Sequence, residues 1–326
     1  MNGQPNVEKS LPHVYTIILN WNQADYTLDC LDSLLNSDYP NHTTVVVDNA
    51  STDGSEQKIC ERFPSIHLIR NSENLGYSEG NNVGIRYALQ QQADYVFLLN
   101  NDTVVDPGML SKLVEAAESK VDTGITGPTM YYMDPPEVLW GGENQIDWKK
   151  ANPVRLKMGD QHPREVIRNG LPVETDYIDS CAVLIKREVL EKIGLMDNRY
   201  FINFDDLDLN TRARKAGYKV VYVPGAVMWH KVSAAMGLAS PATTYYMTRN
   251  SLLFFWTHAP GIWKYTSFLL LFSRHLRTIG AWSLRRKYRD EIFRRRRNAS
   301  LFALRDFFQG RYGRMGKDVA EVCAKR

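Results

Sequence analysis

Short apolar runs alternate with stretches of helical periodicity from residue 14 to residue 119, and this alternation restricts the possible folds more than any other feature of the sequence. Such runs predict buried strands, and apolar residues at helical spacing predict amphipathic helices. Their alternation predicts an α/β fold with a mostly parallel sheet covered by helices on both faces. The strands are expected at residues 14–19, 43–47, 66–69 and 95–99, and the helices at 26–35, 56–63, 81–90 and 108–119.

The rest of the chain is less regular. Between residues 130 and 172 Pro, Gly and polar residues dominate, so we expect mostly loops there. From Tyr245 onward the sequence is helical in period, aromatic and basic. We therefore expect an α/β domain over residues 1–250 and a helical, basic region over residues 251–326. Between the two stretches we expect strands at 182–186 and 220–223 and helices at 187–193 and 206–215.

Charge is distributed unevenly along the chain. Residues 261–326 hold 17 Lys and Arg against 5 Asp and Glu, a net charge of +12, so the first 260 residues carry −9 of the total +3. This asymmetry indicates that the basic end contacts an anionic membrane or a nucleic acid.

Other sequence features narrow the class of protein. Four cysteines without metal-ligand spacing predict free thiols in a reducing compartment. The polar N-terminus lacks the apolar segment of a signal peptide, and no window of about 18 apolar residues predicts a membrane-spanning helix. Neither GxGxxG nor the Walker pattern occurs, so a dinucleotide or ATP site is not indicated.

Polar side chains stand where three of the expected strands end. Asn20 and Asn22 end the motif ILNWN, Asp48 follows VVV, and Asn101 and Asp102 follow YVFLLN. In open α/β sheets ligands bind at the carboxyl ends of the strands. A divalent cation that also binds a diphosphate needs only one or two protein carboxylates, and Asp102 is a candidate. Taken singly, Asp48 and Asp102 are equally consistent with ordinary turn residues.

The stretch NSENLGYSEGNNVGI at 71–85 combines glycine and asparagine before an expected helix. Gly76 and Gly80 would flank a loop whose backbone approaches a ligand closely, and a helix that begins near Asn81 would offer N–H groups to an anion. An ordinary polar loop explains the stretch equally well.

Three carboxylates open the expected helix after an aromatic lead-in, in YFINFDDLDLNTRARKAGY. Acidic residues at a helix N-terminus are favoured by the helix dipole, which is the structural explanation for Asp205, Asp206 and Asp208. Their crowding beside aromatic residues would raise a carboxylate pKa toward that of a general base. His230, after a short strand, is a candidate metal ligand or phosphate contact, although a lone histidine is usually structural.

The order of these motifs resembles glycosyltransferase family 2 with a GT-A fold, in particular its bacterial rhamnosyltransferase-type branch. The succession is strand-NxN, VDNxSxDGS, NxGxxxGxNxG, LLNxDT, an acidic pair with DLxxRxxxxGY, and WH, and it covers roughly residues 13–250.

The resemblance implies roles for individual residues. Asp48 would read the pyrimidine base, and Asp102 would be the last residue of the family's Asp-x-Asp, in which Asn100 replaces the first Asp. Asp102 would then ligate Mg²⁺ or Mn²⁺ with help from His230. Asp205 and Asp206 match the family's Glu-Asp pair, and we favour Asp206 as the base. The other residues implied to bind the donor nucleotide are Asn20, Asn22, Asn74, Gly76, Asn81 and Asn101.

The acceptor would bind near Trp140 and Asp208, although a tryptophan is more often part of a core. The function implied is inverting, metal-dependent transfer of a sugar, best assigned as L-rhamnose from dTDP-rhamnose, with UDP-sugars close behind. The acceptor expected is a hydroxyl of a glycan or lipid-linked molecule in cell-surface polysaccharide synthesis. Two alternatives remain: a non-catalytic nucleotide-sugar or carbohydrate-binding module, and nucleic-acid binding through the basic tail.

The C-terminal region has the composition of interfacial helices, with an apolar body and a basic edge. An anionic cytoplasmic leaflet would attract it. We expect a cytoplasmic protein that is peripheral on the inner face of the cell membrane, and no nucleic-acid partner. A solvated helical face or an oligomer contact is the simpler alternative.

Overall fold

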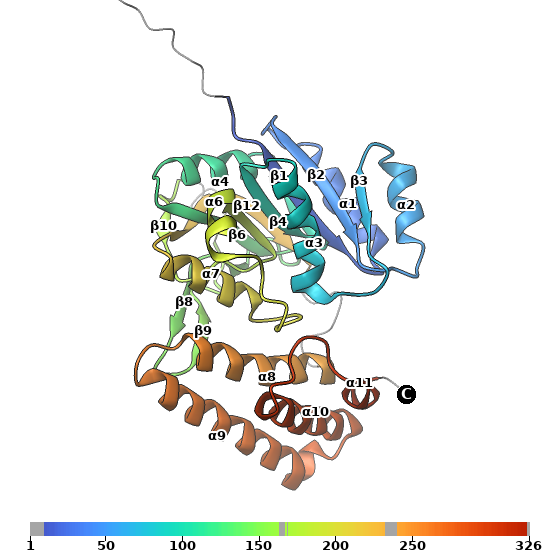
Figure 1. Cartoon of the computed structure of the whole chain (residues 1–326), viewed down its shortest axis with the longest axis vertical. Coiled ribbons are helices and arrows are strands. Elements are labelled where there is room, and N and C mark those ends of the chain that lie inside the picture. Colours follow the sequence, from blue (N-terminus) through green and yellow to red (C-terminus); the bar gives the residue numbers. More distant parts are fainter. Residues whose placement is uncertain (1–9, 163–166, 168, 232–239, 325–326) are drawn as a thin grey trace, which may run out of the picture.

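The computed structural model describes residues 10–162, 167, 169–231 and 240–324, which fold into a sheet domain and a set of C-terminal helices beside it (Figure 1). The described residues form a 10-stranded sheet with the main order β10-β12-β6-β11-β4-β1-β2-β3, and helices lie on both of its faces. The predicted α/β class is confirmed.

Four parallel strands form the N-terminal side of the sheet: β1 (Val14–Asn20), β2 (His42–Asp48), β3 (His67–Arg70) and β4 (Tyr95–Asn100). The register pairs Asn20 with Asp48 and Leu19 with Asn100, so the polar strand ends meet at one edge of the sheet. The helices between and after these strands are α1 (Ala24–Leu34), α2 (Ser55–Arg62), α3 (Gly76–Gln90) and α4 (Met109–Glu118).

The other half of the sheet is mixed. Strand β11 (Ala182–Lys186) is antiparallel to β4 and to β6 (Thr123–Tyr132), whereas β12 (Lys219–His230) is parallel to β6. The short strand β5 (Thr103–Val105) pairs antiparallel with the end of β12 and sets Thr103 opposite His230. Helices α6 (Arg187–Ile193) and α7 (Asp205–Lys215) lie between β11 and β12 in the chain.

The expectation of loops between residues 130 and 172 was wrong in part. Strand β6 extends to Tyr132, and three short strands follow it: β7 (Leu139–Gly141), β8 (Asn144–Asp147) and β9 (Asn152–Arg155). Strands of three or four residues are too short to produce a clear alternation in the sequence. Likewise β12 runs seven residues beyond the expected end at Val223, because its register shift between Val223 and Val227 accommodates the Pro-Gly pair. The two-residue strand β10 (Val173–Glu174) pairs with β12 at the edge of the sheet.

The described part of the C-terminal region contains four α-helices and the short 3₁₀ helix η1 (Arg286–Tyr288). The α-helices are α8 (Pro241–His258), α9 (Trp263–Leu284), α10 (Glu291–Phe308) and α11 (Lys317–Cys323). Helix α8 packs against α7, α9 and α10 (Figure 1). One apolar cluster joins Phe204 and Leu207 at the start of α7 to Phe254, Leu271 and Leu304 of the C-terminal helices. Residue 250, the expected domain boundary, lies inside α8. Among the described helices none is long and apolar enough to cross a bilayer.

Helix α3 begins at Gly76, five residues before the expected start, so Gly76 and Gly80 lie in the helix and do not flank a loop. Both glycines permit close packing. A Cβ on Gly76 would lie 2.5 Å from the Phe201 ring, and one on Gly80 would lie 2.7 Å from the Leu19 side chain. Phe201 also accepts a hydrogen bond from Tyr77 N at 2.7 Å, which holds the start of α3 against the loop before α7.

We predict that Gly76→Ala destabilises the protein more than Gly54→Ala does. Both glycines have φ of +80°, so both substitutions incur the same backbone strain. Only at Gly76 does the new Cβ collide with a ring, whereas at Gly54 its nearest contact is Gln57 at 3.9 Å. Overpacking of this kind costs about 1–3 kcal/mol, and denaturant unfolding of the two variants measures the difference. Equal losses would show that Phe201 moves freely aside.

Candidate active site

A polar network fixes the ends of β1 and β2. Asn20 donates from Nδ2 to Asp48 Oδ1 at 2.8 Å and to Ser51 Oγ at 3.0 Å. Asp48 Oδ2 accepts from Ser51 N at 2.9 Å, and Asn22 Oδ1 accepts from Thr52 N at 2.7 Å. Asn20 and Asp48 are buried, so in this structure their polar groups organise the loop after β2.

A cavity of about 540 Å³ lies beside this network, between the strand ends and the C-terminal helices. Of the predicted donor-site residues, Asn74, Gly76 and Asn101 line it, and so does Asp102. Asn20, Asn22 and Asp48 are not among the described residues that line it. The other described residues that line it are Leu19, Trp21, Gln23, Asn49, Tyr77, Asn100, Phe201, Ile202, Ser240, Ala242, Tyr246, Arg314, Met315 and Ala320.

Several of these lining residues were missed by the sequence analysis. Trp21 lies inside the motif ILNWN and is 42% exposed, and such an exposed aromatic residue at a strand end was a usable signal. Arg314 and Tyr246 reach the cavity only through tertiary packing, and no local pattern marks them. Asn81 was expected to contact the donor, but it is buried and donates from Nδ2 to Tyr77 O at 2.9 Å. It therefore stabilises the first turns of α3.

Asp102 and His230 meet at the cavity, although they lie 128 residues apart in the chain. His230 Nε2 lies 3.1 Å from Asp102 Oδ1, and both side chains are buried. Their partner strands β5 and β12 hold them together, and Lys231 N donates to Asp102 O at 2.9 Å. Trp140 packs edge-on against the His230 ring at 4.7 Å and beneath Arg155 at 4.4 Å, which supports the pair from behind.

The chemistry of this pair fits a divalent cation. A carboxylate oxygen and an imidazole nitrogen converge, and His230 Nδ1 has no hydrogen-bond partner. No group of three or more His, Cys, Asp or Glu residues suited to a metal occurs in the described part of the chain. Mg²⁺ and similar ions are commonly held by one or two carboxylates together with substrate phosphates and water, so two protein ligands are sufficient here.

The acidic pair at the start of α7 lies in a buried, electronegative site. Burial, and then repulsion from Asp179, raises the pKa of Asp206 to about 6. Burial and the neighbouring Asp206 charge hold the pKa of Asp205 well above its usual range. Both carboxylates accept hydrogen bonds from Ser180, and Asp205 Oδ2 has no partner. Asp206 retains partial exposure whereas Asp205 is 2% exposed, and neither is among the described residues that line the cavity.

Tyr77 connects the acidic pair to the cavity. Its hydroxyl group contacts both Asn100 Oδ1 at 2.8 Å and Ser180 O at 2.7 Å. Asn100 belongs to the cavity wall beside Asp102, and Ser180 is the residue that hydrogen-bonds Asp205 and Asp206. Tyr77 therefore lies between Asn100, two residues before the predicted metal ligand Asp102, and Ser180, which hydrogen-bonds the predicted base Asp206. Asp205 and Asp206 themselves are not among the described residues that line the cavity.

The loop before α7 adopts an unusual backbone that the C-terminal region holds in place. Phe201, Asn203 and Phe204 have φ values of +63°, +66° and +69°, a conformation that costs L-residues of order 1 kcal/mol each. Asn250 of α8 donates from Nδ2 to the carbonyls of Tyr200, Ile202 and Asn203 at 2.8–3.0 Å. Helix α8 thereby shapes the segment that presents Asp205 and Asp206, a role that the sequence did not reveal.

The comparisons with known proteins agree with this geometry. The sequence model described as glycosyl transferase family 2 matches residues 15–194. The chain belongs to glycosyltransferase family 2. It is 27% identical over 273 residues to N-acetylglucosaminyl-diphospho-decaprenol L-rhamnosyltransferase of Mycobacterium tuberculosis, covering 77% of this chain and 87% of the relative. It is 25% identical over 253 residues to dTDP-rhamnosyl transferase RfbF of Shigella flexneri, covering 74% and 79%.

Solved glycosyltransferase structures share the fold. The mannosyltransferase PcManGT of Pyrobaculum calidifontis, in complex with GDP-Man and Mn²⁺, superposes with a TM-score of 0.57 at 18% identity, covering 92% of this chain and 88% of that one. GalNAc-T7 with UDP, GalNAc and Mn²⁺ superposes with a TM-score of 0.61 at 15% identity, covering 93% and 57%. The predicted GT-A fold and the resemblance to family 2 rhamnosyltransferases are confirmed.

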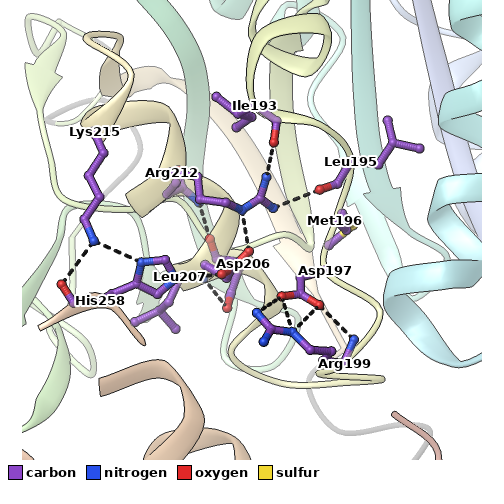
Figure 2. Close-up of polar contacts among 12 residues, drawn as sticks. Ile193, Leu195, Met196, Asp197, Arg199, Asp206, Leu207, Arg212, Lys215 and His258 are labelled. Atoms are coloured by element: carbon purple, nitrogen blue, oxygen red, sulfur yellow. Dashed lines mark hydrogen bonds and ion pairs between the residues drawn. The ribbon is translucent and has the colours of Figure 1, made fainter. Parts of the chain in front are cut away.

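Asp208 of this glycosyltransferase points away from the acidic pair and into the joint between α7 and α8. It accepts from His258 Nε2 at 2.7 Å and from Arg212 Nε at 2.7 Å. Figure 2 shows Arg212 also reaching the carbonyls of Ile193 and Leu195, and His258 contacted by Lys215. Burial opposes the charged form of Asp208, but the bonds from His258 and Arg212 outweigh it and lower its pKa.

This geometry does not favour the expected acceptor contacts. Both oxygens of Asp208 are bonded, and its exposure is 1%. Trp140, the other residue expected to contact the acceptor, is 9% exposed and supports His230. The three neighbouring carboxylates are therefore divided between a pair of raised pKa, Asp205 and Asp206, and Asp208, which belongs to a structural ion pair.

We predict that Asp208→Asn destabilises the protein by about 3–5 kcal/mol, because it leaves Arg212 and His258 without their buried counter-charge. The folded pKa of Asp208 lies below its unfolded value, so its contribution is present above about pH 4 and is lost as the pH falls further. Denaturant unfolding between pH 3 and pH 7 measures both effects. Asp25→Asn, which breaks an exposed ion pair with Lys58, is the control and should have little effect.

Proposed function

We propose that this glycosyltransferase transfers L-rhamnose from dTDP-L-rhamnose to a hydroxyl of a glycan or lipid-linked acceptor, with inversion, in cell-surface polysaccharide synthesis. Both relatives are named as rhamnosyltransferases, and one of them is named for a dTDP-sugar donor. The observation that supports the proposal most is a chain of contacts that runs from Asp206, a carboxylate of raised pKa, through Ser180 and Tyr77 to Asn100, which lines the cavity together with Asp102.

The donor would occupy the cavity at the strand ends. Trp21 offers an exposed aromatic face for the base or the sugar, and Asn74 and Asn101 offer polar groups beside it. Both oxygens of Asp48 accept hydrogen bonds, from Asn20 and Ser51, so this network would have to open for Asp48 to reach a pyrimidine base. UDP-sugars remain the alternative donors, since an aspartate would pair with uracil and thymine alike.

Asp102 and His230 would hold Mg²⁺ or Mn²⁺. When bound, the ion neutralises charge that develops on the leaving nucleoside diphosphate. Asp102 and His230 are held by the β5–β12 pairing, so their ligand atoms need little rearrangement to bind it. Trp140 packs against the His230 ring and is covered in turn by Arg155, which would keep the imidazole in place.

Asp206 would act as the general base. A pKa of about 6 leaves most of its carboxylate ionised at neutral pH and more basic than an ordinary aspartate. It would take the proton of the acceptor hydroxyl as the oxygen attacks the anomeric carbon on the face opposite the diphosphate, and this single displacement inverts the configuration. Burial and the charge of Asp206 also raise the pKa of Asp205. A non-catalytic binding module would have no need of such a carboxylate.

We predict that Asp206→Asn lowers the transfer rate by about 10²–10⁴-fold and leaves nucleotide binding intact, because it removes the proton acceptor and keeps the shape. In the unmodified protein kcat/KM should fall about tenfold per pH unit below pH 6, as Asp206 becomes protonated. The assay combines dTDP-L-rhamnose, Mg²⁺ or Mn²⁺ and candidate acceptors, with the product linkage determined by NMR.

Asp176→Asn is the control for this experiment, because Asp176 pairs with Arg214 and lies outside the cavity. Near-normal turnover of Asp206→Asn would reject the base assignment. Absence of transfer from every nucleoside diphosphate sugar by the unmodified protein would reject the proposed function.

We also propose that α9 places the enzyme on an anionic membrane. Its solvent-facing side exposes five large apolar side chains at helical spacing, with exposures from 46% to 85%: Ile262, Tyr265, Leu269, Leu276 and Leu284. Exposed basic residues follow directly at the end of the helix: Arg285, Arg286, Lys287 and Arg289. An apolar stripe with a basic border matches an anionic lipid surface better than a nucleic acid, which would leave the stripe in water.

The double variant Leu269→Asp/Leu276→Asp is expected to abolish sedimentation with phosphatidylglycerol-containing vesicles, because it introduces negative charge into the apolar stripe. Leu35→Asp, which alters an equally exposed leucine at the end of α1, should sediment like the unmodified protein. Vesicle binding that is unchanged in the double variant would reject the membrane role of α9.

A further inference from the structure

The charges on the cavity wall are few. Among the described residues that line the cavity, only Asp102 and Arg314 are charged. Asp102 already faces His230, and the remaining wall is made of amide, hydroxyl and apolar groups. A diphosphate ester brings negative charge into this space. Arg314 is therefore the charge on the wall whose role needs an explanation. It lies on the side of the cavity that the C-terminal region forms.

The backbone on both sides of Arg314 is anchored. Gly313 N donates to Arg199 O at 2.7 Å, and Met315 N donates to Tyr246 Oη at 3.1 Å. Gly313 has a φ of +74°, which turns the chain between α10 and α11 toward the sheet domain. Tyr246 in turn stacks on Phe201 with a centroid distance of 5.2 Å. The position of Arg314 at the cavity is thus set by the backbone contacts of its neighbours Gly313 and Met315. It does not depend on the contacts of the Arg314 side chain.

The Arg314 side chain itself forms only a weak, exposed ion pair. It forms an ion pair with Glu73 at 3.2 Å, and the two side chains are 59% and 64% exposed. Exposed pairs of this kind contribute little free energy, so Arg314 can exchange Glu73 for another anion at small cost. The guanidinium group matches the geometry of phosphate oxygens and can bind two of them at once.

We infer that Arg314 binds a phosphate of a diphosphate ester in the cavity, so that the C-terminal region supplies part of the substrate site. The inference rests on the proposed function and adds a ligand contact to it. Two sources share this chemistry: the nucleoside diphosphate of the donor and the diphosphate of a lipid-linked acceptor. The second is considered because Phe201, Ile202, Tyr246 and Met315 make the adjoining wall apolar.

The test compares two variants that break the same ion pair. Arg314→Ala removes the cation, whereas Glu73→Ala removes only its partner. Calorimetry measures the dissociation constants of dTDP and, in a separate arm, of farnesyl diphosphate, with thymidine and farnesol as probes that lack phosphate. Arg311→Ala is the matched control, since Arg311 is an exposed arginine of the same segment that does not line the cavity.

Arg314→Ala should weaken binding of one diphosphate probe about tenfold or more, the loss expected for a charge-assisted contact. Glu73→Ala and Arg311→Ala should bind at least as tightly as the unmodified protein, Arg314→Lys should recover part of the loss, and thymidine and farnesol should be unaffected. A loss confined to dTDP assigns the contact to the donor, and a loss confined to farnesyl diphosphate assigns it to the acceptor.

Two results would overturn the inference: unchanged affinity of Arg314→Ala for both probes, or an equal loss in Glu73→Ala, which would make the ion pair merely structural. Sugar transfer by the unmodified protein is measured in parallel. Transfer combined with unchanged affinity in Arg314→Ala rejects the role of Arg314 and retains the proposed function. If diphosphate binding depends on Arg314 but the unmodified protein transfers no sugar, the role of Arg314 is retained and the proposed function is rejected.

Discussion

The antiparallel pairing of β5 with β12 is the constraint on which the site depends. It sets Thr103 opposite His230 and so brings Asp102 beside an imidazole 128 residues away in the chain. The parallel register of β1, β2 and β4 positions the remaining residues of the site, because all three strands end at the same edge of the sheet. A slip of one residue in either pairing would turn the polar groups to the opposite face. The site is therefore a consequence of backbone pairing before any side chain binds a ligand.

The three aspartates at the start of α7 have different pKa values because their buried surroundings differ. Asp208 is bonded to Arg212 and His258 and has a lowered pKa. Burial and neighbouring carboxylates raise the pKa of Asp205 and Asp206, and the hydrogen bonds from Ser180 and Leu207 and the charge of Arg155 do not outweigh them. The same helix thus carries an ion pair that contacts α8 and, two residues earlier, a carboxylate whose raised pKa suits the base proposed above. Because Asp208 fastens α7 to α8, the orientation of Asp206 depends on the C-terminal region as well as on the sheet.

The sequence predicted the features that local patterns encode. Short apolar strands, amphipathic helices and the polar strand ends were all visible, and the family resemblance followed from their order. The sequence did not predict β7, β8 and β9, which are too short to alternate clearly, or the early start of α3, since two glycines resemble a loop until Phe201 and Leu19 are seen against them. At the cavity it identified Asn74, Gly76 and Asp102 but not Arg314 or Tyr246, because these approach through tertiary packing alone. Asp208 was assigned to the acceptor because its partner His258 lies 50 residues away, beyond any local motif.

The C-terminal helices connect the proposed membrane surface to the cavity. Buried Arg249 of α8 donates to Arg199 O at 3.2 Å and contacts Tyr245, whose hydroxyl donates to Asp306 of α10. These contacts join the loop that carries Phe201 to the helices that flank α9, so a lipid surface bound along α9 would lie at a fixed orientation to the cavity. In the proposed arrangement the charge asymmetry would have two effects: the basic end would attract anionic lipid and diphosphate, and Asp102 and Asp206 of the acidic remainder would face the reacting sugar. A lipid-linked acceptor fits this geometry better than a freely diffusing glycan, because its anchor would already lie at the surface that α9 binds.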